Sequence, residues 1–280
     1  MEMISVPALE GLSAYERAAL REIHLWKHPE ATWFSRATDG VNRALFQATD
    51  LIRKVPGVDW TINNVVAGGL QVVNEIMQDS VWREAVYAEY HRMGHAAGTP
   101  EDLRDLDLQT IDGALRGLDA KYRALAAAEG AATGYLGLPG IAPDVVALVA
   151  LNLRAVGEYA TYCGFDVRDP AERLYALEIL NLVSHPSDTA KQVTLAPVIR
   201  VTQHVARQQT MQNVQEFALT RAIRNAVSAL GVRLTRAKLA QILPVAGALV
   251  GSGFNAYYTS KVCDAAFFLY RERFLKRKAE

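Results

Sequence analysis

Residues 134–166 read GYLGLPGIAPDVVALVALNLRAVGEYATYCGFD. The stretch opens with glycines and prolines typical of a turn, and an apolar run then extends from about Asp144, the expected cap, to Cys163. Gly164 follows the last periodic residue and is predicted to end a helix there. Because apolar side chains occupy almost every side of this helix, it is predicted to be the buried central helix of a large helical domain, or else a helix surrounded by lipid.

One narrow polar strip interrupts this apolar surface. Arg154, Glu158 and Thr161 fall on a single face, and the first two have the four-residue spacing of an ion pair. Two interpretations stay open: a structural pair that orients the helix, or a small-molecule pocket in which Arg154 binds an anion beside a carboxyl with a shifted pKa. Lys238 and Asn255 are the further ligand-binding candidates for such a pocket.

The rest of the chain also carries helical signals. Ser13 and Glu16 have the spacing of a capping box, and Thr99 and Asp169 each precede a proline at a helix start. No run alternates at period two for long enough to predict a strand, so we expect an all-α fold in which residues 1–280 form one domain. Besides the central helix, helices are expected over about 13–27, 30–54, 61–77, 80–93, 99–118, 122–132, 169–183, 189–209 (interrupted at Pro197), 214–230 and from 235 onward.

Composition excludes some classes of function. Thirty basic residues balance thirty acidic ones, which argues against a general nucleic-acid-binding protein. The two cysteines, Cys163 and Cys263, lie in apolar helical contexts, so a disulfide framework is not expected and a reducing cytosol fits. The N-terminus lacks the basic and apolar regions of a secretory signal.

Between Lys238 and Lys261 the sequence carries no charge. Its length just reaches the ~20 residues that a membrane span requires, although polar residues and a proline dilute it. Gly247 and Gly251 would let another backbone approach closely. The segment is therefore either a tightly packed core helix or a helix that inserts into, or lies in, a bilayer.

The C-terminal stretch interleaves aromatic and basic side chains. This composition is typical of a helix attracted to an anionic membrane surface, but cations also stabilise the C-terminus of an ordinary helix. The membrane-surface candidates are Phe267, Phe268, Tyr270, Arg271, Arg273, Phe274, Lys276, Arg277 and Lys278.

Signals for catalysis and metal binding are weak. His91 and His95, like His24 and His28, are four residues apart and could face one metal ion, but the sequence fixes no third ligand. No nucleophile elbow, phosphate loop or dinucleotide-binding loop occurs. We therefore predict no cofactor and no metal, and no motif indicates an enzyme.

Two blocks of the sequence resemble the bacterial EcsC-like family, over about Asp102 to Leu275, whereas residues 1–101 resemble it only weakly. The family implies a mostly helical cytoplasmic protein and is named for an operon that encodes an ABC-type transporter. The blocks are Gly137–Asp144 with Ala150–Glu158, Tyr162–Asp166 and Asp169–Arg173, and Lys238–Leu275 with Leu243–Gly247, Gly251 and Asn255 inside it.

We therefore expect a cytoplasmic protein that acts at the surface of the inner membrane. Its expected partner is an anionic lipid surface or a transporter-type membrane protein, bound without catalysis. The alternative is an enzyme or ligand-binding protein with a pocket beside Arg154 and Glu158.

Overall fold

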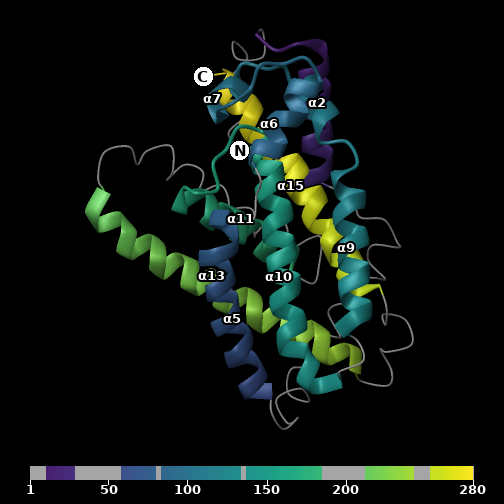
Figure 1. Cartoon of the computed structure of the whole chain (residues 1–280), viewed down its shortest axis with the longest axis vertical. Helices are drawn as coiled ribbons and strands as arrows, with labels where there is room; N and C mark the ends of the chain where they lie inside the picture. The colour runs from purple at the N-terminus through teal and green to yellow at the C-terminus, as the bar shows by residue number, and fades with distance from the viewer. Residues whose placement is uncertain are drawn as a thin grey trace.

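The computed structural model describes residues 11–28, 58–79, 83–133, 137–184, 212–242 and 253–279, and within them every regular element is a helix (Figure 1). The predicted all-α fold is confirmed. The described helices are α2 (Ala14–Lys27), α5 (Val58–Asp79), α6 (Arg83–Arg92), α7 (Pro100–Arg104), α8 (Leu108–Ala114), α9 (Leu118–Thr133), α10 (Gly137–Tyr162), α11 (Pro170–Val183), α13 (Gln212–Ile242) and α15 (Phe254–Ala279).

Helix α10 is the centre of the bundle, as its apolar sequence predicted. It packs against α5, α9, α13 and α15, and also contacts α6 and α11. Figure 1 shows it running through the middle of the molecule, with α9 and α15 on one side and α5 on the other. Leu148, Leu153 and Val156 on α10 are completely buried. Gly164, with φ +73°, follows the helix as expected.

The beginning of α10 differs from the prediction. The helix starts at Gly137 rather than near Asp144, and Pro143 lies inside it. Proline lacks the N–H of an interior helical hydrogen bond, so its position here has a cost. Ile141, Ala142 and Val145 are buried in the core around it, and burial of these side chains offsets that cost.

Helix α13 also runs past its expected end at Gly231. A glycine often stops a helix, but here it allows α13 to lie close against α5. A Cβ atom on residue 231 would lie 3.0 Å from Cγ1 of Val65, so a larger side chain would push the two helices apart. The glycine is therefore an interior contact residue.

The predicted helix starts are confirmed at three positions. Ser13 and Glu16 form both hydrogen bonds of a capping box, Thr99 accepts from the backbone of Asp102, and Asp169 accepts from the backbone of Ala171. These bonds satisfy N–H groups that the first helical turn leaves without partners.

Within the described residues, no helix combines the length and apolar character needed to cross a membrane. Residues 243–252 of the uncharged segment, the expected helix over 30–54 and the expected helix over 189–209 lie outside the described residues. The two interpretations of the uncharged segment therefore stay open.

The C-terminal helix α15 is held in the bundle by a buried ion pair. Arg273 donates two hydrogen bonds to Glu172 of α11, with N–O distances of 2.6 and 2.5 Å. The guanidinium carbon lies 4.1 Å and 4.2 Å from the ring centroids of Phe165 and Tyr175. Both charged side chains are at least 90% buried, since their exposed fractions are 9% and 6%.

We predict that removal of the Glu172 carboxylate destabilises the protein strongly. Glu172→Ala leaves Arg273 charged and unpaired in an apolar site, and the expected loss in the free energy of unfolding is about 3–5 kcal/mol. Urea denaturation followed by circular dichroism measures it. The matched control is Glu101→Ala, which breaks an exposed pair with Arg104 and should cost at most about 1 kcal/mol. Equal midpoints for the two variants would contradict the burial of this pair.

Candidate functional site

Four polar side chains from four different helices meet inside the bundle. Lys238 of α13 lies 2.5 Å from a carboxylate oxygen of Asp144 on α10. It also donates to the amide oxygen of Asn255 on α15, at 2.5 Å. The amide nitrogen of Asn255 donates to Glu129 on α9 at 2.6 Å and to Asp144 at 3.2 Å. We call Glu129, Asp144, Lys238 and Asn255 the four-helix polar cluster.

Close approach of α9 and α15 makes this cluster possible. Asn255 is 98% buried and lies directly against Gly130. A Cβ atom on residue 130 would lie 2.8 Å from the amide nitrogen of Asn255, which is closer than side chains pack. The glycine next to Glu129 therefore gives Asn255 room to reach both carboxyl groups.

The cluster perturbs the titration of Glu129. Burial, together with the negative charge of Asp144, raises the pKa of its carboxyl group to about 7, while Lys238 and the Asn255 amide act in the opposite direction. A carboxyl group with this pKa can hold or release a proton near neutral pH. The cluster can thus store a proton near neutral pH, but its four side chains are occupied by contacts with one another.

The structure brings together two of the predicted ligand-binding candidates, Lys238 and Asn255. It adds Glu129, which the sequence analysis missed, and it gives Asp144 another role. Asp144 does not cap α10, because the helix begins earlier and the Asp144 carboxylate pairs with Lys238. Residues 122–132 are rich in alanine, and an acid near the end of that stretch is the signal that could have drawn attention to Glu129.

The other two candidates, Arg154 and Glu158, do not join this cluster. Glu158 lies about 21 Å further along the α10 axis than Asp144. Its carboxylate, 10% exposed, binds Lys121 of α9 at 2.8 Å and lies 3.7 Å from Nε of Arg154. The Arg154 side chain is 44% exposed, so it lies at the surface and not in the core. The strip lies at the edge of the core, where α9 supplies a second cation.

The membrane-surface candidates on α15 are mostly turned inward. Their cations bind partners on the protein: Arg271 binds Glu22 and Asp112, Lys276 binds Glu272, and Lys278 binds Glu16. Arg273 has the buried pair described above, and Arg277 donates to the backbone carbonyls of Cys163 and Gly164.

The aromatic side chains of α15 follow the same pattern. Tyr270 and Phe274 belong to the core, Phe268 stacks on Trp26, and Phe267 is half-buried. The sequence suggested an exposed face of aromatic and basic side chains, but the structure turns most of them inward. The apolar residues that recur along α15 form the stripe that packs against the core.

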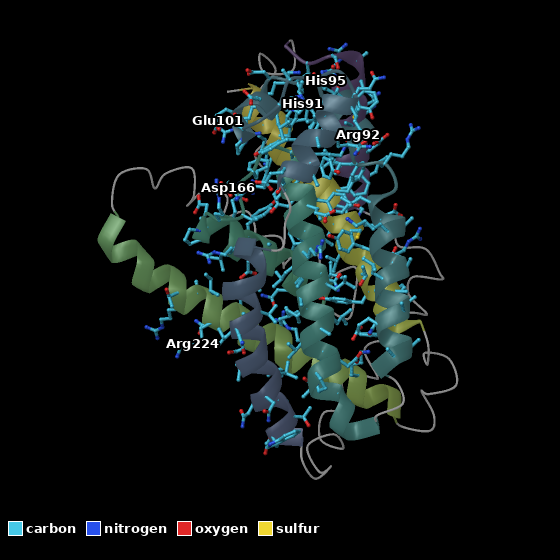
Figure 2. All side chains as sticks on the ribbon, in the orientation of Figure 1. His91, Arg92, His95, Glu101, Asp166 and Arg224 are labelled. Atoms are coloured by element: carbon cyan, nitrogen blue, oxygen red, sulfur yellow. The ribbon has the colours of Figure 1, made fainter. Side chains whose placement is uncertain are left out.

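The histidine pairs lie at the surface. His24 and His28 are exposed with ring centroids 4.5 Å apart, and His91 is exposed at the end of α6 (Figure 2). His95 is half-buried in the following loop. Across the described part of the chain, no three histidine, cysteine, aspartate or glutamate side chains are grouped so that they could hold a metal ion.

The four-helix polar cluster predicts a pH-dependent stability. Because the pKa of Glu129 is higher in the folded protein than its ordinary 4.5, the protonated carboxyl stabilises the fold. That stabilisation is complete below pH 4.5 and is lost as the pH rises through about 7. We expect the melting temperature to fall by a few degrees between pH 5 and 8.

The variant Glu129→Gln should flatten this part of the curve and should melt above the wild type at pH 8. Glu101→Gln, at an exposed carboxylate of α7, is the control and should leave the slope unchanged. Thermal melts at each pH measure both. Parallel curves for the wild type and Glu129→Gln would show that Glu129 does not titrate in this range.

Comparison with known proteins agrees with the resemblance found in the sequence. The model of the EcsC protein family matches residues 17–275, and so includes the helices before Asp102, where the sequence alone showed only a weak resemblance. The chain is 26% identical over 264 residues to "Uncharacterized protein YdbA" of Bacillus subtilis (strain 168), covering 91% of this chain and 90% of that protein. No solved structure gives a significant match. With a match over nearly its whole length, this chain belongs to the EcsC protein family.

Proposed function

We propose that this protein is a non-catalytic, cytoplasmic binding protein that acts at the membrane surface, where the outer face of α2 meets anionic lipid. The outer face of α2 consists of Arg17, Arg21, His24, Leu25 and His28. This exposed set of basic and apolar side chains is the observation that carries the proposal.

The spacing of these residues puts them on one side of the helix. Positions 17, 21, 24 and 28 recur at intervals of three and four residues, and all are exposed. Leu25, 66% exposed, lies among them. A helix face with cations around an exposed apolar side chain is suited to the interface between lipid headgroups and acyl chains.

Packing against α15 explains why this face is basic. The acids of α2 are Glu16 and Glu22, and both bind cations of α15. Glu16 is 99% buried beneath Lys278, and Glu22 pairs with Arg271. The cations of α15 therefore neutralise the acids of α2, which leaves the arginines and histidines of α2 facing outward.

The expected affinity is modest. Each arginine near an anionic membrane contributes on the order of 1 kcal/mol, and salt screens that attraction beyond a Debye length of ~10 Å at 0.1 M. Exposure of Leu25 allows one apolar side chain to enter the interface. Binding should therefore be reversible and sensitive to ionic strength, as it is for peripheral proteins with a single weak signal.

The sequence suggested α15 as the lipid-binding helix, and this proposal moves the contact to α2. The reason is that a cation already paired within the protein attracts lipid headgroups less than one that faces solvent. A transporter-type protein partner remains the competing explanation for a role at the membrane, and the experiment below distinguishes the two.

We predict that the wild-type protein co-sediments with phosphatidylglycerol vesicles at low salt. It should not bind phosphatidylcholine vesicles, and 0.5 M salt should release it from the anionic ones. Replacing Arg17 and Arg21 with glutamine should lower the affinity about 10- to 30-fold, since two contributions of about 1 kcal/mol are removed.

The matched control is Arg221→Gln with Arg224→Gln, which removes two exposed arginines from α13; Figure 2 shows Arg224 directed away from the bundle. The control should bind like the wild type, and thermal melts should show that both double variants are folded. Equal loss in both would mean non-specific attraction and would reject the α2 site. Binding to native membranes but not to lipid vesicles would replace lipid with a membrane-protein partner.

A further inference from the structure

The outer face of α2 ends in two neighbouring histidines. His24 and His28 are both exposed, and their ring centroids lie 4.5 Å apart with an angle of 77° between the rings. His28 is the C-cap of the helix, and its backbone N–H donates to the carbonyl of His24 at 3.0 Å. Because this bond closes the last turn of α2, it keeps the two imidazoles close together.

Neither imidazole is engaged by the rest of the bundle. Within the described residues, neither ring forms a hydrogen bond or an ion pair. The other cation of the last turn, Lys27, binds Glu272 of α15, which also binds Lys276. The histidines are therefore the groups of this turn whose charge can act on something outside the protein.

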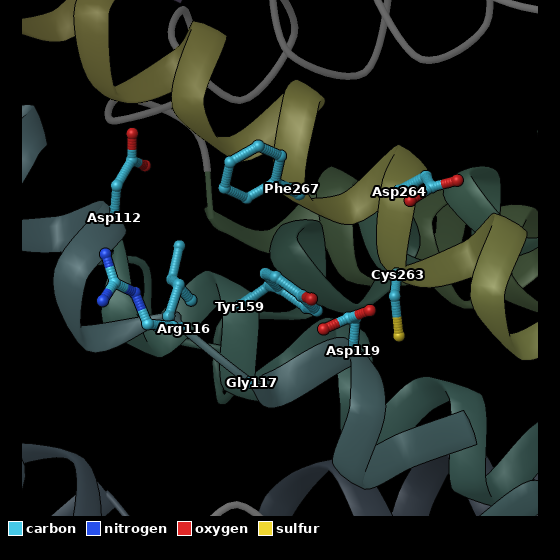
Figure 3. Close-up of a pocket in the computed structure, with 9 residues that line it drawn as sticks. Asp112, Arg116, Gly117, Asp119, Tyr159, Cys263, Asp264 and Phe267 are labelled. Carbon is cyan, nitrogen blue, oxygen red and sulfur yellow. The ribbon is translucent and has the colours of Figure 1, made fainter. Parts of the chain in front are cut away.

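The charged groups on the helices packed against α2 are already paired. Helix α2 packs mainly against α15 and α8. Asp112 of α8, which lines a cavity of about 280 Å³ together with Phe267 of α15 (Figure 3), accepts hydrogen bonds from Tyr15 and Arg271. The charged side chains of α15 that bind the acids of α2, its Lys27 or one another are Arg271, Glu272, Lys276 and Lys278. Every carboxylate in this set has a cation, so the charge of a protonated histidine pair is left to face solvent.

Protonation of the pair depends on what lies next to it. Histidine is the side chain whose charge normally changes between pH 5 and 8. The partial negative charge at the C-terminus of α2 favours an imidazolium there, whereas a second imidazolium 4.5 Å away opposes it. An anionic membrane attracts both charges and so offsets this repulsion. Since such coupling is reciprocal, a proton that strengthens binding to lipid is itself held more tightly on the membrane.

We infer that His24 and His28 make the lipid contact of α2 dependent on pH, so that binding to anionic lipid strengthens as the pH falls from 7.5 to 5.5. This inference rests on the proposed function of the same face and adds its regulation. Both histidines lie beside the exposed Leu25, so they reach the level of the headgroups when Leu25 enters the interface. Arginine keeps its charge throughout this range, so Arg17 and Arg21 provide binding at neutral pH and the histidines add to it.

Vesicle co-sedimentation at two pH values tests the inference. With phosphatidylglycerol vesicles in 0.1 M salt, the affinity of the wild type should rise about 10- to 30-fold from pH 7.5 to pH 5.5, since two further charges reach the surface. His24→Gln with His28→Gln should lose this rise. His24→Lys with His28→Lys should bind tightly at both pH values, because lysine is charged at both, and a merely structural role of the histidines would not produce this result.

The matched control is His91→Gln with His95→Gln, which removes two histidines of the same spacing at the end of α6 and in the loop that follows. It should keep the full rise. Glu129 also titrates in this range, but it is present in every variant, so the difference between the two glutamine variants isolates His24 and His28. Thermal melts at both pH values should show that all variants are folded.

Equal affinity of the wild type at the two pH values, a rise that persists in the His24 and His28 glutamine variant, or an equal loss in the control would overturn the inference. The proposed function fails separately. Binding at pH 7.5 that requires Arg17 and Arg21 but does not change with pH would reject only the role of the histidines. Wild-type binding by Arg17→Gln with Arg21→Gln, or no binding at either pH, would reject the α2 site itself.

Discussion

A charge inside an apolar helical bundle must find a partner, and this constraint determines how the helices of this protein are arranged. An unpaired ion in such an interior costs several kcal/mol, whereas a paired and hydrogen-bonded one can be accommodated. Arg273 therefore ties α15 to α11 through Glu172, and Lys238 ties α13 to α10 through Asp144. Hydrophobic burial supplies the driving force for packing. These pairs favour one position of each helix over neighbouring positions, in which the buried charges would be unpaired.

The same constraint decides which charges remain for binding. The C-terminal sequence is rich in arginine and lysine, yet its cations are mostly consumed by acids of α2, α8 and α11. The basic surface that composition suggested for α15 is therefore found on α2, because the cations of α15 neutralise the acids of α2 and leave its outer face basic. A charge count along a sequence does not identify a binding surface until the pairing between helices is known.

Much of the fold could be predicted from local patterns. The apolar run of α10, the capping box at Ser13 and the cap at Asp169 are encoded within a few residues, and the structure agrees with each of them. Gly231 was misinterpreted because its role depends on Val65, a residue far away in the sequence. Local patterns describe a helix, but not the neighbour against which it packs.

The sites were harder to predict for the same reason. Lys238 was identifiable as the charge that borders an uncharged segment and Asn255 as a polar residue inside it. Glu129 becomes notable only when α9 and α15 lie together. Asp112 of α8 carried no signal in the sequence, because its partners Tyr15 and Arg271 come from two other helices, α2 and α15.

The pairing of the first described helix with the last has a consequence for the order of folding during synthesis. Glu16 and Lys278 are 262 residues apart, and Glu16 is almost completely buried in the finished protein. At a translation rate of roughly 5–20 residues per second, the ribosome needs on the order of 10–50 s to make the residues between them. Throughout that interval α2 lacks the cation that compensates its buried acid. Helix α2 can therefore form early, but its docking against α15 comes only after that helix has left the ribosome.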